Sequence, residues 1–60
     1  MIMKVLIVED DRASSAYMKA CVESQGHQTR VAGDGLKGLE VFQEFKPKLV
    51  IAETLSEPGN

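Results

Sequence analysis

Four acidic side chains follow the two most apolar runs of the sequence. Glu9, Asp10 and Asp11 come directly after KVLIV, and Glu53 comes directly after LVIA. A run that is apolar at every position is typical of a strand buried on both faces in an α/β sheet. Such sheets bind their ligands at the carboxyl ends of the strands. We therefore expect these acids, Glu9 and Asp10 among them, to lie in the crevice where such sheets bind ligands.

The segment after these acids predicts a helix over residues 12–25. Asp11 can cap this helix by accepting a backbone N–H of the first turn, and Gly26 can end it with a left-handed conformation. The spacing of three and four positions defines a face that we expect to turn inward: Ser14, Tyr17, Met18, Cys21, Val22 and Gln25. Cys21 is predicted to be a small apolar core residue. The lone His27, just beyond the helix, is predicted to be a solvated loop residue.

The chain continues with a strand, a helix and a further strand. Residues 28–32 (QTRVA) predict a short polar strand at the edge of a sheet, and turn residues 33–35 lead into a helix over residues 35–45. The face of this helix that we expect to turn inward carries Gly38, Leu39, Phe42 and Phe45. Lys46-Pro47 ends the helix, because the residue before a proline avoids the α conformation. Leu49–Ala52 (LVIA) then predicts a strand that is apolar on both faces.

Together these elements predict an α/β fold with the order β-α-β-α-β. Parallel strands joined by right-handed helical crossovers, with the polar strand at one edge, give a three-stranded sheet in the order 2-1-3 with one helix on each face. This arrangement is half of a flavodoxin-like doubly wound parallel sheet. Residues 1–60 contain no repeat or linker and are predicted to form a single domain.

Size and composition restrict the class of protein. Sixty residues are at most half of an ordinary domain, and a chain this short is only marginally stable by itself. The single cysteine and the lack of an apolar leader segment favour a reducing, cytoplasmic setting. No window is long and apolar enough for a membrane span. The net charge of −2 argues against nucleic acid as the main partner.

Several motifs together resemble the N-terminal half of a response-regulator receiver domain, the module of two-component signalling and phosphorelays. They are KVLIVEDD at residues 4–11, the turn Ala32-x-Asp34-Gly35, and Lys46-Pro47-x-Leu49-Val50-Ile51, and with the first helix they cover the chain to about residue 56. The resemblance implies that Glu9 and Asp10 hold Mg²⁺. It also implies that Glu53 stands where the family has an aspartate that accepts a phosphoryl group from a histidine kinase. The cation would neutralise the carboxylates and the incoming phosphoryl charge.

Three departures from the family pattern lead us to expect that this chain is not phosphorylated. Glu53 is one methylene longer than aspartate, which moves its carboxylate away from the in-line geometry of phosphoryl transfer. The family's proline four residues after the acceptor is here Glu57, and Pro58 comes one residue later. The sequence also stops before the serine or threonine of the fourth strand and the lysine of the fifth, which bind the phosphoryl group in the family.

The last predicted strand also indicates an interaction between chains. In a complete receiver a fourth strand flanks it, whereas here its apolar residues, Leu49, Val50, Ile51 and Ala52, would form an open edge that no charge or proline interrupts. Antiparallel pairing of two such edges about a two-fold axis would give a continuous six-stranded sheet. We therefore predict a homodimer through this strand. The alternative is a fragment that is completed by other residues.

The leading functional hypothesis is a non-catalytic, receiver-derived signalling module, a pseudo-receiver, that self-associates or binds a signalling protein. It is not expected to be an enzyme or to require a cofactor. The alternative is a phosphoacceptor receiver, or a truncated piece of one, that binds Mg²⁺. A more distant alternative is nucleotide binding, because Gly33-x-Gly35-x-x-Gly38 matches the glycine pattern of dinucleotide sites. The polar strand before these glycines, and Asp34 beside a bound pyrophosphate, argue against that alternative.

Overall fold

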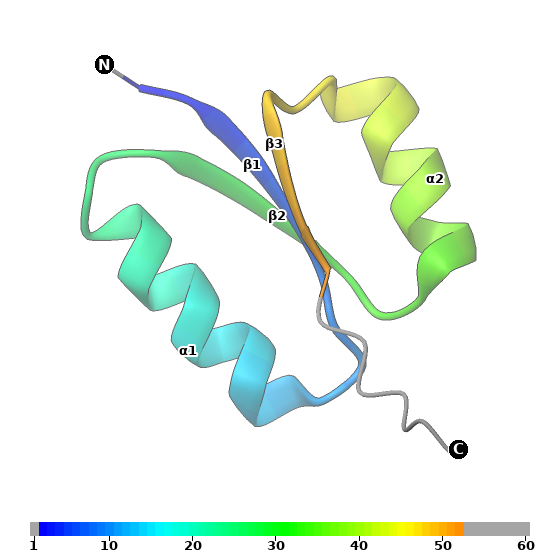
Figure 1. Cartoon of the computed structure of the whole chain (residues 1–60), viewed down its shortest axis with the longest axis horizontal. Helices are drawn as coiled ribbons and strands as arrows, with labels where there is room; N and C mark the ends of the chain where they lie inside the picture. Colours follow the sequence, from blue (N-terminus) through cyan, green and yellow to red (C-terminus); the bar gives the residue numbers. More distant parts are fainter. Residues whose placement is uncertain (1, 53–60) are drawn as a thin grey trace.

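The computed structural model describes residues 2–52 as two helices and three strands. In chain order these are β1 (Lys4–Val8), α1 (Arg12–Glu23), β2 (Gln28–Ala32), α2 (Gly35–Phe45) and β3 (Leu49–Ala52). The strands form one parallel sheet in the order β2-β1-β3, and the two helices lie on opposite sides of it (Figure 1). The α/β class, the element order and the strand order predicted from the sequence are confirmed. Dimerisation through β3 stays a prediction.

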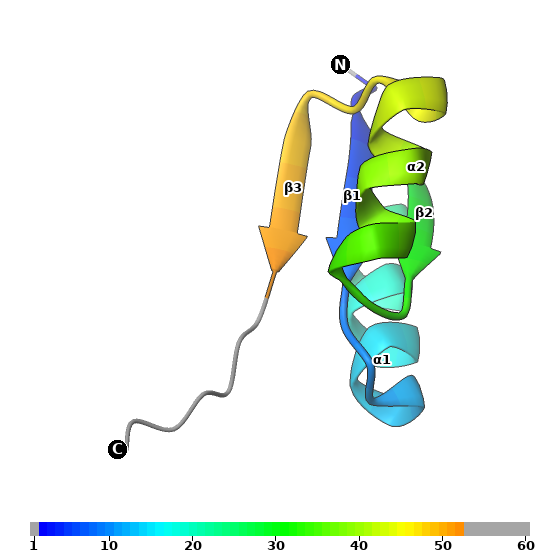
Figure 2. The same ribbon diagram turned by 90° about the vertical axis from the view of Figure 1, so that its right-hand side faces the viewer.

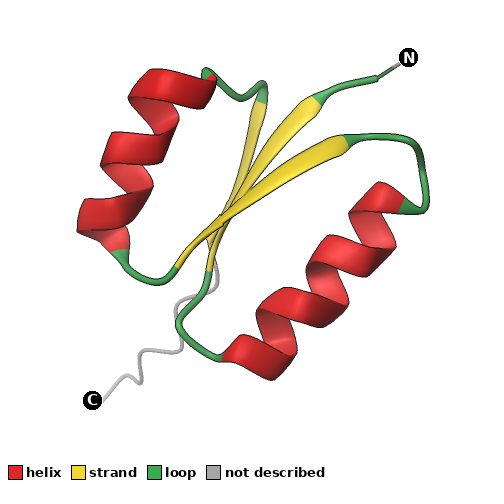
Figure 3. Ribbon diagram, turned by 180° about the vertical axis from the view of Figure 1, so that it is seen from behind, coloured by secondary structure: helices red, strands yellow, loops and turns green. Residues whose placement is uncertain are grey.

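The core of the molecule is the central strand β1. Its residues Val5, Leu6 and Ile7 are at most 1% exposed. Backbone pairing places Val8 beside Ala32 of β2 on one side and beside Ala52 of β3 on the other. The helices cover the two faces of β1, as the view from behind also shows (Figure 3). An apolar run buried in this way stabilises the fold by roughly 1.5–3 kcal/mol for each large side chain.

The inward face predicted for α1 is wrong in part. Met18 and Val22 are half-buried, but Tyr17 is 72% exposed and Cys21 is also exposed, so Cys21 is not a core residue. The residue that α1 buries fully is Ser15, whose hydroxyl donates to a backbone carbonyl three residues earlier. The face that α1 buries therefore carries Ser15, Met18 and Val22, and the part of the predicted stripe with Tyr17 and Cys21 is turned outward.

The helix α2 shows the same offset. Gly38 is buried and Phe45 is half-buried, as predicted, whereas Leu39 and Phe42 are 56% and 45% exposed, contrary to the prediction. The physical reason is common to both helices, because both lie over β1 and β2. Among the described elements β3 is in contact with β1 alone, and it stands to one side of the helices (Figure 2). The helix surfaces that extend toward β3 thus have no neighbour in residues 2–52.

The helix ends agree closely with the sequence signals. α1 ends at Glu23, two residues earlier than predicted, because the N–H groups of Gln25 and Gly26 bond to carbonyls three residues back in a tightened last turn. Gly26 has a φ of 91°, in the left-handed region expected of it. α2 ends at Phe45, and Lys46 follows with a φ of 53°. Neither helix of the described chain is long and apolar enough to cross a membrane.

Candidate functional site

Glu9, the first acid after β1, is buried, although strand-end acids are commonly solvated. It is only 7% exposed. Its backbone N–H donates to the Ala32 carbonyl of β2 at 3.0 Å, and its Oε2 accepts the backbone N–H of Asp11 at 3.0 Å. Glu9 is therefore held at the junction of β1, β2 and the start of α1.

The next two acids have different environments. Asp10 is exposed. Asp11 is the N-cap of α1, as predicted: its backbone is extended, and its Oδ2 accepts the N–H of Ser14 at 2.8 Å. Hydrogen bonds from the side chain and the backbone of Ser14 lower the pKa of Asp11 below its ordinary value. The cap is therefore an ionised carboxylate at the helix end where the macrodipole favours negative charge.

The strand register determines which acids can approach one another. β1 and β3 are parallel, and Val8 lies beside Ala52. Glu9 follows Val8 in the sequence, and Glu53 follows Ala52. Glu53 itself lies outside the described residues 2–52, as do Glu57 and Pro58. Its predicted place near Glu9 and Asp10 therefore stays a prediction.

The donors at the end of β1 have the chemistry that Mg²⁺ requires. Mg²⁺ is usually held by one or two carboxylates together with water and a phosphate ligand, and Glu9 and Asp10 supply two such carboxylates. Because Oε2 of Glu9 accepts the N–H of Asp11, Oε1 is the oxygen left for a cation. No group of three His, Cys, Asp or Glu side chains within residues 2–52 is placed to hold a metal ion. The pair fits Mg²⁺ by donor type, and ligation by it stays a prediction.

The glycine pattern of residues 33–38 has a structural explanation. Asp34 caps α2, since its Oδ1 accepts the N–H of Lys37 at 2.8 Å. Gly38 lies against the sheet, where an added Cβ would come within 3.0 Å of Cγ2 of Val8. The glycine thus permits the close approach of α2 to β1, as predicted. The Asp34 carboxylate already accepts an N–H at the helix end that a pyrophosphate would need.

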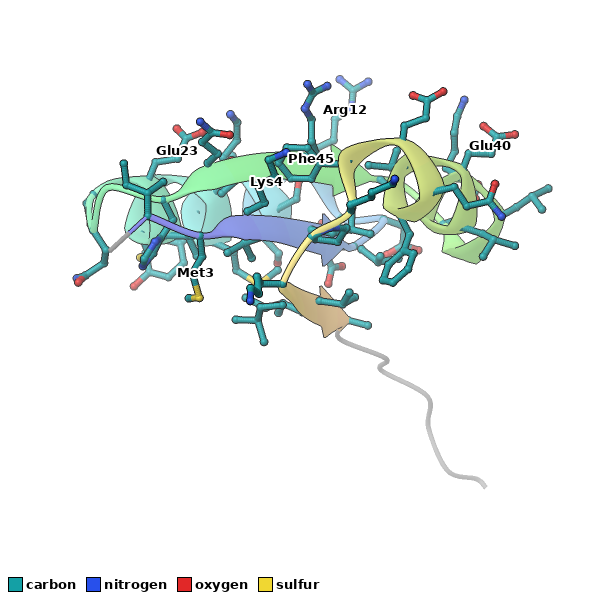
Figure 4. The ribbon with its side chains drawn as sticks, turned by 90° about the horizontal axis from the view of Figure 1, so that it is seen from above. Met3, Lys4, Arg12, Glu23, Glu40 and Phe45 are labelled. Carbon is teal, nitrogen blue, oxygen red and sulfur yellow. The ribbon has the colours of Figure 1, made fainter. Side chains whose placement is uncertain are left out.

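A polar cavity between β1, β2 and α2 was not predicted from the sequence. It has a volume of about 370 Å³ and is lined by Lys4, Gln28, Arg30, Val41, Glu44 and Phe45. The Nζ of Lys4 lies 5.4 Å from the centre of the Phe45 ring, and Figure 4 shows these two side chains close together. The guanidinium of Arg30 lies 5.0 Å from the centre of the same ring. Side chains alternate between the two faces of a strand. Lys4 of β1 and Arg30 of β2 lie on the same face of the sheet, the face that α2 covers. The alternation of side chains along the two strands was the signal that could have predicted this.

His27 also differs from the prediction of a solvated loop residue. It is half-buried, and its Nδ1 accepts the backbone N–H of Met3 at 3.1 Å. This bond ties the turn before β2 to the residue before β1. It is a long-range contact that no local sequence signal marks.

Curated proteins similar to this chain are response regulators. The chain is 32% identical over 56 residues to the DNA-binding response regulator MtrA of Mycobacterium tuberculosis strain H37Rv, and equally to MtrA of Mycolicibacterium smegmatis. The predicted resemblance to response regulators is confirmed. Each match covers 93% of this chain, so the resemblance extends over nearly all of the elements described above.

These relatives are much longer than this chain, which spans about a quarter of their length. The 60 residues fit part of a receiver domain, in agreement with the parallel 2-1-3 sheet and its two helices. No model of a known protein family matches the chain, and no solved structure matches it.

Proposed function

We propose that this chain is a non-catalytic, receiver-derived signalling module that acts by binding proteins, including a second copy of itself. The observation that carries the proposal is the state of β3. Leu49 and Val50 are 45% and 42% exposed, and no described element covers this strand apart from β1 on one side. An apolar strand with an unpaired edge is a template for association with another chain.

We further propose that Glu53 does not accept a phosphoryl group. It stands at the position that the resemblance assigns to the phosphoacceptor, one residue beyond the end of β3. Phosphoryl transfer depends on positioning of the attacking oxygen in line with the leaving group, and an extra methylene displaces that oxygen by roughly a bond length. Glu9 and Asp10 would then hold Mg²⁺ without a transfer step. The bound ion would supply positive charge among the carboxylates.

The partners that we propose are proteins. A second copy of the chain is the first, and a signalling protein that recognises a receiver surface is the second. The relatives are named as DNA-binding proteins. DNA binding is not part of the proposal for these 60 residues, because their net charge of −2 offers little attraction to a phosphate backbone.

A specific observation also favours a second function, that of a phosphoacceptor receiver. Three acids follow the central strand β1, and the first of them, Glu9, is held there through its backbone N–H and its side chain. Carboxylates at this position are suitable ligands for Mg²⁺. In that function a carboxylate oxygen would attack the phosphorus of a phosphodonor. An acyl phosphate would form, and the donor's leaving group would depart with the electrons of the broken bond.

Exposure to a small phosphodonor separates the two functions. The folded chain is incubated with acetyl phosphate and Mg²⁺, and its intact mass is measured, with the E53D variant as the matched control. We expect no gain of a phosphoryl group by the wild-type chain. Addition of one phosphoryl group to the wild type would contradict the proposal, and fragmentation of the adduct would identify the acceptor. Phosphorylation of E53D alone would show that the length of the Glu53 side chain prevents transfer.

A further inference from the structure

We propose that the cavity between β1, β2 and α2 is a binding site for a small organic carboxylate with an apolar body. Such a site goes beyond the proposed protein-binding function and does not depend on it. Lys4 is the first residue of β1 and Gln28 is the first residue of β2, so the cavity lies at the amino ends of these parallel strands. Glu9 and Asp10 follow the carboxyl end of β1, so the cavity is separate from the candidate metal ligands.

The strand register and the end of α2 bring the lining residues of this cavity together. Lys4 and Gln28 are partners in the pairing of β1 with β2. Arg30 lies two residues beyond Gln28, on the same face of β2. Phe45 is the last residue of α2 and is half-buried. The cavity between them has a volume of about 370 Å³, which is within the range of small-ligand sites.

Two cationic side chains converge on one aromatic ring in this cavity. The Nζ of Lys4 lies 5.4 Å from the centre of the Phe45 ring, and the guanidinium of Arg30 lies 5.0 Å from the same centre. The face of an aromatic ring attracts cations at these distances, so the ring holds the two charges near one another. Like charges repel. An anion bound to both side chains would offset that repulsion.

The protein groups of residues 2–52 leave both cations available to a ligand. The ion pair of this part of the chain joins Lys19 to Glu23 on α1. Across the same residues, neither the Lys4 ammonium nor the Arg30 guanidinium donates a hydrogen bond to another protein group. Glu44 also lines the cavity, but in the described chain it forms no ion pair with either cation.

The lining side chains determine the chemical class of the ligand. The guanidinium of Arg30 can hold a carboxylate through two parallel N–H donors, and the ammonium of Lys4 can donate to a remaining lone pair. Val41 and Phe45 offer apolar surface to the rest of the ligand. The two cations and Glu44 together carry a single positive charge. That charge suits a carboxylate better than a doubly charged phosphate, which the Glu44 carboxylate would repel more strongly.

NMR titration of the isotope-labelled chain tests the site, with benzoate as the probe. We expect saturable shifts of the Lys4, Arg30 and Phe45 amides with benzoate, and none with benzamide, which has a similar shape and no charge. R30Q should weaken benzoate binding at least about tenfold, because it removes a charge-assisted hydrogen bond. The matched control K37Q removes a charge from an exposed position of α2 outside the cavity and should leave the binding unchanged. E44Q should tighten the binding, because it removes a negative charge that repels benzoate.

Other results of the titration would overturn the proposed site. Equal shifts with benzamide, or no saturable shift with benzoate, would show that the cavity does not select a carboxylate. Tighter binding of inorganic phosphate than of benzoate would contradict the ligand class. Lower thermal stability of R30Q with unchanged benzoate binding would show that the cations only offset the negative end of the α2 dipole. If R30Q does not fold by circular dichroism, K4Q replaces it, and the same loss of benzoate binding is expected.

Discussion

At the scale of single residues, Glu9 combines a structural role with its predicted role as a ligand. The apolar run before it predicted that an acid would stand at the end of the central strand. The burial of Glu9 was not predictable, and neither was its hydrogen bond from the Asp11 N–H at 3.0 Å. This bond depends on how the chain turns into α1. The caps of both helices, Asp11 and Asp34, were predictable, because capping is a local interaction between residues three positions apart.

Truncation of Glu9 is expected to destabilise the fold more than truncation of its neighbour. E9A removes the acceptor of the Asp11 N–H and leaves that donor unsatisfied, which should cost about 1–2 kcal/mol of unfolding free energy. D10A is the matched control, because Asp10 is exposed and should change the stability by less than about 0.5 kcal/mol. Urea unfolding followed by circular dichroism, at one protein concentration, measures both. Equal stability of the two variants would contradict the structural role of Glu9.

At the scale of elements, Gly38 sets the distance between α2 and the sheet. A valine at this position would place its branched side chain against Val8, where a Cβ alone would already come within 3.0 Å of Cγ2. We expect G38V to lower the unfolding free energy by about 2–3 kcal/mol through overpacking. L36V introduces the same residue on the 73% exposed Leu36 of the same helix and should cost less than about 0.5 kcal/mol. Thermal unfolding measures both variants. Similar midpoint temperatures for G38V and L36V would show that α2 can shift away from β1.

The elements were predictable from the sequence, but the faces that they bury were less so. Apolar runs, helix caps and Lys46-Pro47 marked nearly every boundary, because these are local signals. The predicted inward residues Tyr17, Cys21, Leu39 and Phe42 proved exposed. Hydrophobic spacing identifies the side chains that are suited to burial. It does not show which of them meet a partner within residues 2–52, and the sides of both helices near β3 meet none.

At the scale of the whole molecule, the 2-1-3 sheet followed from chain order and from the polar character of β2. Right-handed crossovers leave few ways to connect three parallel strands, so the topology was predictable. The cavity beside Lys4, Arg30 and Phe45 was not predicted, because it requires the register of two strands and the position of α2 together. Within residues 2–52 the strand β3 contacts β1 alone, and exposed apolar side chains occur on β3 and on both helices.

The mass of the folded chain in solution tests the central claim most directly. Size-exclusion chromatography with multi-angle light scattering should give twice the chain mass of 6.6 kDa. V50K should shift the mass toward the monomer, because it introduces a charge into the apolar strand through which we propose that the copies pair. L36K, a lysine at an exposed site on α2, should leave the dimer intact. A folded wild-type chain with a mass of 6.6 kDa at every concentration tested would contradict the account.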